Sequence, residues 1–363
     1  DIICANVNIK RGPIPQPKPF VVFETAEGIK IAVLGLLQIS RATGMPDSNP
    51  ENIKGIRFEA EIETARRYRY LKKANDVFIA LTHMGYEKDK KLARELGELD
   101  VIIGGHSHTI IEEPGLSNGV LIVQTGSKNR YLGKIELVLK EGRLAGKTAR
   151  LIELKILKEE DPRVARMIDR YTDNPELNRV IARLGKALEG KDEIGNLMTD
   201  AIRIGLGLDL AFYNSGGIRL HFLNKTVRLK DIYALDPFDN EIIIFEMNPS
   251  EIRSLIRFDY ENIKPLDLKV SGIQCKLIAT SDRKVVSIEL RARDGFLLDE
   301  NRFYTVGMNN YMASGYHFNH RDPGHSSYRK VVDLLISYLQ KGVDIYLVKQ
   351  EKRMFEKIIP VDN

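Results

Sequence analysis

Three histidines follow two short apolar runs in the first third of the chain, and their placement is typical of metal ligands. His83 comes soon after the apolar run at 77–81, and His106 and His108 follow the run at 101–103 across two glycines. If both runs are strands of one open sheet, their carboxyl ends deliver these side chains to one place. Imidazole suits transition metals such as zinc or iron better than it suits calcium. The pattern therefore predicts a metal site.

The alternative is that each histidine only caps a strand with a hydrogen bond, which is the commoner role of a single histidine. Three histidines at two strand ends favour metal binding over this alternative. His106 and His108 are two residues apart, so in an extended segment both side chains would point the same way. The remaining histidines stand in polar sequence and are expected at the surface; they are His221, His317, His320 and His325.

The surrounding sequence alternates apolar runs with amphipathic stretches. This alternation predicts βαβ units and a mostly parallel sheet. The expected strands lie at 29–36, 77–81, 101–103 and 120–123, the expected helices at 57–73 and 87–97, and a hairpin at 132–155 closes the unit. A charged stretch at about 158–190 shows no strand signal and predicts a helical linker.

The remainder of the chain has an α+β pattern. Its expected strands lie near 209–213, 241–247, 270–279, 285–292, 303–308 and 343–348, with helices at 195–206 and 327–341. We therefore expect an α/β domain at 1–157, the helical linker at 158–190 and an α+β domain at 191–363.

The composition limits the classes of partner. The chain has 363 residues, of which 43% are hydrophobic and 29% charged, as in ordinary globular proteins. Its apolar runs are shorter than the roughly 18 residues that a membrane-spanning helix needs, so no membrane span is expected. The net charge of +5 is spread among interleaved acidic and basic residues, so binding of a nucleic-acid polymer is not expected either.

The histidine segments at 81–85 and 104–108 resemble the last two metal-binding blocks of the calcineurin-like metallophosphoesterases. The resemblance implies an incomplete four-layer α/β/β/α domain that binds two divalent metal ions, zinc, manganese or similar. It also implies that His83 and His106 bind one ion and that His108 binds the other.

The second half of the chain resembles the C-terminal domain of the 5′-nucleotidases. The similar blocks occur in the same order as in that family, at 194–201, 214–219, 236–240, 270–272 and 309–318. The resemblance implies a nucleotide or nucleoside ligand, with Asn214 hydrogen-bonding the ribose or a phosphate and with Phe238 and Phe318 enclosing the base. Arg219 follows two glycines closely, so its guanidinium can fork onto a phosphate or carboxylate. Core packing is the alternative role of each aromatic ring.

Several expected family blocks are missing. The sequence contains no Asp-x-His, no Gly-Asp and no Gly-Asn-His, which in the family supply acidic ligands and the catalytic histidine. Three neutral imidazoles cannot hold two ions about 3.5–4 Å apart. We therefore expect the catalytic residues in a segment upstream of Asp1, and the present chain to be inactive alone. The stretch at 188–193 lacks the arginine that many nucleotidases place there, and Lys191 could substitute for it as a point charge. Residues 314–317 depart from the family's Gly-Gly-Asp-Gly.

The resemblance implies metal-dependent hydrolysis of nucleotide phosphate esters, outside the cytoplasm as for many relatives. Two alternatives remain open. The same fold serves 2′,3′-cyclic nucleotide and sulfur-ester hydrolysis, and a chain without acidic ligands could instead be a catalytically dead nucleotide-binding module.

Overall fold

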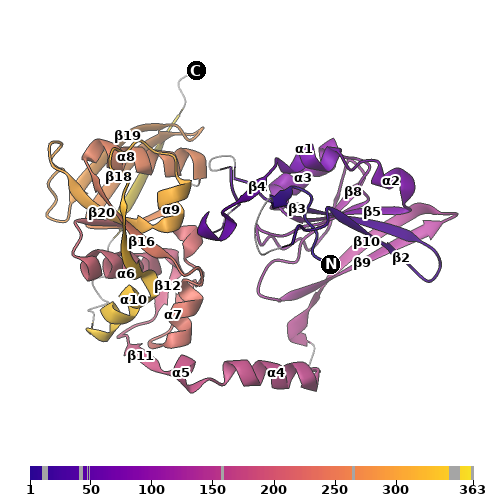
Figure 1. The fold of residues 1–363 in the computed structure, drawn as a ribbon, viewed down its shortest axis with the longest axis horizontal. Coiled ribbons are helices and arrows are strands. Elements are labelled where there is room, and N and C mark those ends of the chain that lie inside the picture. Colours follow the sequence, from indigo (N-terminus) through magenta and orange to yellow (C-terminus); the bar gives the residue numbers. More distant parts are fainter. Residues whose placement is uncertain are drawn as a thin grey trace. The chain divides into compact units, whose positions relative to one another are not determined.

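The structure is a computed structural model that describes residues 1–9, 15–40, 44–46, 48, 50–156, 159–263, 266–342 and 352–360. The chain divides into two compact units (Figure 1). Unit 1 comprises Asp1–Ser48 and Ile53–Glu160, and unit 2 comprises Asn49–Asn52 and Asp161–Asn363.

Unit 1 is built on a six-stranded sheet with the order β2-β3-β5-β6-β8-β7. Its strands are β2 (Phe20–Glu24), β3 (Lys30–Leu37), β5 (Val77–His83), β6 (Val101–Ile103), β7 (Leu116–Ser117) and β8 (Val120–Val123). The central strands β3, β5, β6 and β8 are parallel, and β2 and β7 are antiparallel strands at the two edges. The expected mostly parallel sheet is confirmed.

The two faces of this sheet are covered differently. Helices α1 (Glu61–Arg66), α2 (Leu71–Ala74) and α3 (Tyr86–Glu95) bury the face that carries Phe78 and Ala80. The long hairpin of β9 (Tyr131–Lys140) and β10 (Arg143–Glu153) packs on the opposite face. Successive residues of a strand point to opposite faces, which is why one apolar strand serves both layers.

The segment at 57–73 differs from the single helix expected there. It begins in strand β4 (Ile56–Phe58), which pairs antiparallel with β1 (Val7–Ile9), and only then continues as α1 and α2. The pairing joins residues about fifty positions apart, and a local apolar pattern does not reveal such a partner.

Unit 2 has a five-stranded sheet with the order β17-β13-β20-β16-β21. These strands are β13 (Leu210–Asn214), β16 (Glu241–Met247), β17 (Leu268–Ser271), β20 (Tyr304–Asn309) and β21 (His325–Lys330). Only β13 and β20 are parallel neighbours. Ala211 and Tyr213 face a core shared with α6 (Gly190–Leu206), α7 (Leu229–Leu235) and α10 (Val331–Gln340).

The other face of this sheet carries Leu210 and Phe212. It packs on α8 (Pro249–Phe258) and on strands β18 (Ile273–Thr280) and β19 (Val285–Ala292). Strand β22 (Met354–Ile359) pairs parallel with β18. The short helix α9 (Asn310–Gly315) directly follows β20.

Residues 158–190 contain strands where we expected helix alone. After α4 (Pro162–Thr172) and α5 (Pro175–Asn178) come β11 (Val180–Arg183) and β12 (Leu188–Glu189). These strands pair with β15 (Thr226–Arg228) and β14 (Phe222–Leu223), whose distance along the chain hid them from a local pattern. The start of the helix expected at 327–341 belongs to β21, and the strand expected at 343–348 lies outside the described residues.

Within the part of the chain that the structure describes, no helix has the length and apolar character needed to cross a membrane.

Candidate functional site

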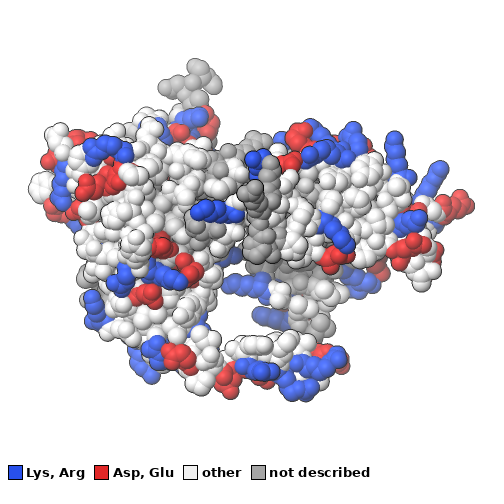
Figure 2. Space-filling view, in the orientation of Figure 1, with Lys and Arg blue, Asp and Glu red and all other residues white. Residues whose placement is uncertain are grey.

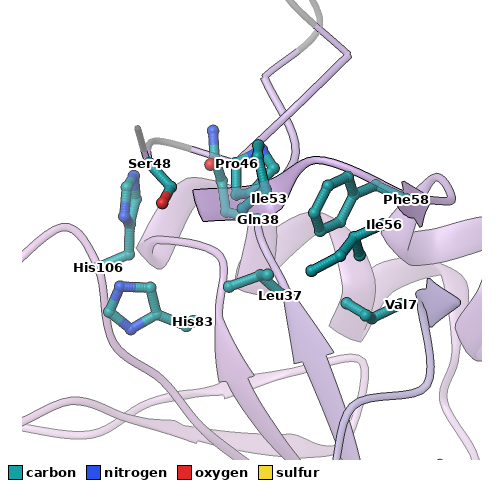
Figure 3. Close-up of a pocket in the computed structure, with 10 residues that line it drawn as sticks. All are labelled: Val7, Leu37, Gln38, Pro46, Ser48, Ile53, Ile56, Phe58, His83 and His106. Carbon is teal, nitrogen blue, oxygen red and sulfur yellow. The ribbon is translucent and has the colours of Figure 1, made fainter. Parts of the chain in front are cut away.

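His83 and His106 lie together at the carboxyl ends of two neighbouring strands. His83 is the last residue of β5, and His106 follows β6, the parallel neighbour of β5. The two ring centroids are 5.2 Å apart and the rings are edge-to-face (Figure 3). Of the three imidazoles that we expected to meet at these strand ends, the structure brings these two together.

The loop that carries His106 and His108 is a turn and not the extended segment we expected. Both residues have left-handed backbone conformations, with φ of 73° and 55°, which is uncommon outside glycine. Gly105 lies against the His83 ring, because a Cβ at Gly105 would stand 3.1 Å from His83 Nδ1. His108 is exposed and His106 is half-buried. The turn therefore places His106 beside His83 and leaves His108 at the surface.

Gln124, directly after β8, fixes this turn by three hydrogen bonds. Its Oε1 accepts hydrogen bonds from Ser107 Oγ at 2.9 Å and from the Thr109 N–H at 2.5 Å. Its Nε2 donates to the Gly105 carbonyl at 2.9 Å. Gln124 is 2% exposed, so three bonds to a buried amide hold the conformation of the histidine turn.

Asp89 of α3 lies behind the same turn. Thr82 Oγ1 donates to Asp89 Oδ1 at 2.7 Å, whereas Oδ2 is buried with no hydrogen-bond partner among the described residues. A Cβ at Gly104 would stand 2.3 Å from that oxygen, so the position admits only glycine without a shift. Burial raises the pKa of the Asp89 carboxyl to about 6. Sequence reasoning missed Asp89, because its position in an amphipathic helix resembles that of any surface carboxylate.

A cavity of about 370 Å³ opens beside the two imidazoles (Figure 3). Its wall is mostly apolar, with polar side chains near the histidines. The lining residues are Val7, Leu37, Gln38, Pro46, Ser48, Ile53, Ile56, Phe58, His83 and His106.

The donor set at this place does not amount to a two-metal centre. Among the described residues, no group of three or more histidines, cysteines, aspartates or glutamates stands ready to hold an ion. In a two-metal centre the paired ions stabilise both the attacking and the leaving oxygen of a phosphate displacement. Neutral imidazoles alone do not hold two such ions close together. The described residues supply a pair of imidazoles but not the acidic ligands, so they do not fit two metal ions by themselves.

In unit 2 the structure brings Arg219 and Phe238 together. The exposed Arg219 guanidinium carbon lies 5.6 Å from the centre of the half-buried Phe238 ring. The Arg219 N–H donates to the Leu235 carbonyl at 3.0 Å, which ties the Arg219 turn to the end of α7. A positive charge and an aromatic face thus meet at one edge of unit 2.

Asn214 and Lys191 lie at the start of the Arg219 turn. Asn214 ends β13, is 7% exposed, and its Oδ1 accepts from Asn309 Nδ2 at 2.8 Å. Lys191 Nζ donates to the Ser215 carbonyl at 2.7 Å. Lys191, in the stretch that lacks the family's arginine, therefore supplies a cation beside this turn.

Phe318 is only 9% exposed and packs in the core around α8. Its ring centroid lies 6.5 Å from that of Phe245 and 4.6 Å from that of His320, whose ring is inclined by 37°. The expected stacking surface of Phe318 is thus covered here by the His320 imidazole. His221, His317, His320 and His325 are all exposed, as predicted.

Lys and Arg are interspersed with Asp and Glu over the face in view in Figure 2, in keeping with the mixed charge pattern of the sequence.

Comparisons with known proteins find a family match in the second half of the chain. Residues 173–318 match the family described as 5′-nucleotidase, C-terminal domain. The chain is 27% identical over 381 residues to a 5′-nucleotidase of Vibrio cholerae, covering 87% of this chain and 67% of that protein. It is 25% identical over 336 residues to Endonuclease YhcR of Bacillus subtilis, covering 86% of this chain.

The chain spans about a quarter of the length of Endonuclease YhcR and of the Trifunctional nucleotide phosphoesterase protein YfkN of the same organism, 27% and 24% respectively. Among solved structures, the 5′-nucleotidase precursor of Thermus thermophilus superposes with a TM-score of 0.79 at 23% identity, covering 98% of this chain and 78% of that one. The predicted architecture, an α/β unit followed by an α+β unit, is confirmed, and the fold is similar to that of the Thermus thermophilus protein.

Proposed function

We propose that the chain serves the hydrolysis of nucleotide phosphate esters, because residues 173–318 match the 5′-nucleotidase C-terminal domain family and the chain is similar to 5′-nucleotidases over most of its length. The observation that carries the proposal is the contact between Arg219 and Phe238. An aromatic face binds a nucleobase by stacking, worth roughly 1–3 kcal/mol. A guanidinium beside it binds a phosphate or carboxylate through paired hydrogen bonds.

In this proposal the two halves of the nucleotide are recognised by different residues. Phe238 stacks on the base and Phe318 is its second aromatic partner, while Arg219 and Asn214 hold the ribose and phosphate. Lys191 adds a positive charge beside them, as a point charge without the planar fork of arginine. The mixed surface charge supports a small nucleotide ligand over a nucleic-acid polymer.

We assign His83, His106 and His108 to a site for divalent ions such as zinc or manganese. The chemistry that such ions would supply at this site is polarisation of the phosphate and activation of a water molecule. The assignment requires carboxylate ligands in addition to the imidazoles that the described residues provide. We also place the protein outside the cytoplasm, on the strength of its resemblance to 5′-nucleotidases alone.

A second candidate is a nucleotide-binding module without hydrolytic activity. The specific observation in its favour is the donor set, which among the described residues contains no complete metal-holding group. Under this alternative unit 2 keeps its ligand, and unit 1 serves as a scaffold.

The test of the enzymatic proposal is phosphate release by the natural full-length gene product. AMP, 2′,3′-cyclic AMP, p-nitrophenyl phosphate and a short single-stranded oligonucleotide are offered with manganese or zinc. We expect release from AMP to exceed release from p-nitrophenyl phosphate. We also expect it to fall by about a hundred-fold in His106→Ala, because loss of a residue that merely orients a metal ligand already costs about 10–100-fold. Nucleoside binding without release from any of these esters would establish the second candidate instead.

A further inference from the structure

A buried polar network lies behind the Arg219 and Phe238 pair. The Tyr213 hydroxyl donates to Asp236 Oδ2 at 2.9 Å, and Asn240 Nδ2 donates both to the Tyr213 hydroxyl and to Asp236 Oδ1, each at 2.9 Å. The three residues are 0%, 1% and 3% exposed. Three polar side chains are therefore removed from water and satisfy one another.

This network holds the loop that carries Phe238 from both sides. Asp236 and Asn240 are the two ends of the loop, and Phe238 is its centre. Asp236 Oδ1 also accepts from the Phe238 N–H at 3.2 Å. Asp239, next to Phe238, has a left-handed φ of 57°, a conformation that surrounding contacts must maintain. The position of the Phe238 ring thus depends on the hydrogen bonds made by Asp236 and Asn240.

The ring of Tyr213 reaches the other loop of the site. A Cβ at Gly217 would stand 2.7 Å from Tyr213 Cε1, so the turn that leads to Arg219 lies directly on the tyrosine ring. One side chain therefore contacts both loops, the Arg219 turn through its ring and the Phe238 loop through its hydroxyl.

We propose that Tyr213 is a positioning residue for nucleobase binding, whose hydroxyl sets the place of the Phe238 ring while its ring supports the Arg219 turn. This inference rests on the proposed function of unit 2. Apolar side chains of similar volume would fill the same space without desolvating a carboxylate. A satisfied buried network instead fixes one geometry, which a stacking site requires.

The test uses the full chain and separates the hydroxyl from the ring. Tyr213→Phe removes only the hydroxyl, and binding is measured by calorimetry with adenosine and with ribose 5-phosphate, which lacks a base. We expect the affinity for adenosine to fall about ten-fold, or about 1.4 kcal/mol, and the affinity for ribose 5-phosphate to stay unchanged. Tyr233→Phe, on a side chain of α7 that is 49% exposed, is the matched control and should bind both ligands as the parent does.

A second readout follows the Phe238 ring directly. The chain contains no tryptophan, so Phe238→Trp introduces a single tryptophan, whose emission can be excited apart from that of the tyrosines. Adding Tyr213→Phe to this variant should move the tryptophan emission maximum to longer wavelength, because the indole ring loses its fixed position against the protein and meets more water. Asn240→Ala breaks the network from the other end of the loop and should shift both readouts in the same direction, which keeps the test open if Tyr213→Phe does not fold.

Two outcomes overturn the inference while leaving the proposed function intact. In the first, Tyr213→Phe binds adenosine as tightly as the parent does, although Phe238→Ala no longer binds it. The other is an equal loss for adenosine and ribose 5-phosphate with unchanged tryptophan emission, which would assign Tyr213 to stability alone. If the parent chain itself binds neither adenosine nor ribose 5-phosphate, the proposed function of unit 2 fails, and this inference with it.

Discussion

Phe318 and His320 illustrate how a single side-chain contact can decide access to a binding surface. The two rings lie 4.6 Å apart with an inclination of 37°, and the imidazole is exposed while the phenyl ring is buried. A base that stacks on Phe318 must therefore take the place of His320.

His320→Ala removes this cover, and we expect it to increase the affinity for adenosine several-fold, since a stacked aromatic contact is worth roughly 1–3 kcal/mol. Calorimetric titration with adenosine measures the change. Phe318→Leu, which keeps an apolar side chain of similar size, should abolish the gain in the His320→Ala background. An affinity for adenosine that is the same in the parent, in His320→Ala and in the double variant would show that Phe318 is a core residue only.

Asp89 gives unit 1 a pH-dependent stability. Its carboxyl has an ordinary pKa of 3.8, which burial raises to about 6 in the folded protein. Well below pH 3.8 the group is protonated in both the folded and the unfolded state and has no effect. As the pH rises from 4 to 6 the unfolded chain ionises first, so the folded state becomes less favourable, by as much as about 3 kcal/mol above pH 6.

Asp89→Asn cannot ionise and keeps an oxygen for the Thr82 hydroxyl. We therefore expect its melting temperature, relative to that of the parent, to rise between pH 4 and pH 8. Calorimetric melting across this range gives the comparison, with Glu87→Gln on the exposed side of the same helix as control. A constant difference between Asp89→Asn and the parent at every pH would rule out this titration.

At the scale of elements, the strands with unbroken apolar runs were the most predictable. The strand expected at 241–247 coincides with β16, and those expected at 77–81 and 101–103 underlie the histidine site. Hydrophobic periodicity is local, and these segments need no distant partner to be recognised. The convergence of His83 and His106 followed from the predicted strands, because the carboxyl ends of parallel neighbours meet at the same edge of a sheet.

Elements that owe their form to distant partners were not predictable in this way. Strands β4 and β11 lie where helix was expected, and each pairs with a segment about fifty residues away. The left-handed turn at His106 depends on hydrogen bonds from Gln124, and the burial of Phe318 depends on packing around α8. Tyr213 and Asp236 were equally hidden, since a sequence shows polar residues without showing that they are buried together.

Strand β22 depends on an ion pair that joins it to α6. Arg353, directly before β22, is 6% exposed and forms two hydrogen bonds of 2.9 and 2.8 Å to the carboxylate of Asp200. It also donates to the Val270 carbonyl at 2.9 Å. The guanidinium thus links the last described strand to the centre of unit 2.

Arg353→Met leaves the Asp200 carboxylate buried without its partner, and we expect it to lower the free energy of unfolding by about 3–5 kcal/mol. Urea denaturation followed by circular dichroism measures this change. The double variant Arg353→Met with Asp200→Leu should recover part of the loss, because it removes the unpaired charge. If Arg353→Met lowers the free energy of unfolding by less than the double variant does, the ion pair is not what stabilises β22.

At the scale of the whole molecule, each unit contributes a different part of one proposed activity. Unit 1 presents imidazoles and a cavity of about 370 Å³ beside them, and unit 2 presents a cation and an aromatic ring. The fold is similar to that of the solved 5′-nucleotidase precursor of Thermus thermophilus, at 23% sequence identity, and this likeness says nothing of the substrate. The identity of the ligand therefore rests on the chemistry of Arg219 and Phe238.

The most direct test of this account is a calorimetric comparison of AMP binding by the chain and by its Phe238→Ala and Arg219→Ala variants. Stacking and phosphate recognition each contribute, so we expect AMP to bind the parent and each substitution to weaken it at least about ten-fold. Adenosine should be sensitive mainly to Phe238→Ala, and ribose 5-phosphate mainly to Arg219→Ala. A parent chain that binds no AMP, or variants that bind it as tightly as the parent, would contradict nucleotide recognition by unit 2.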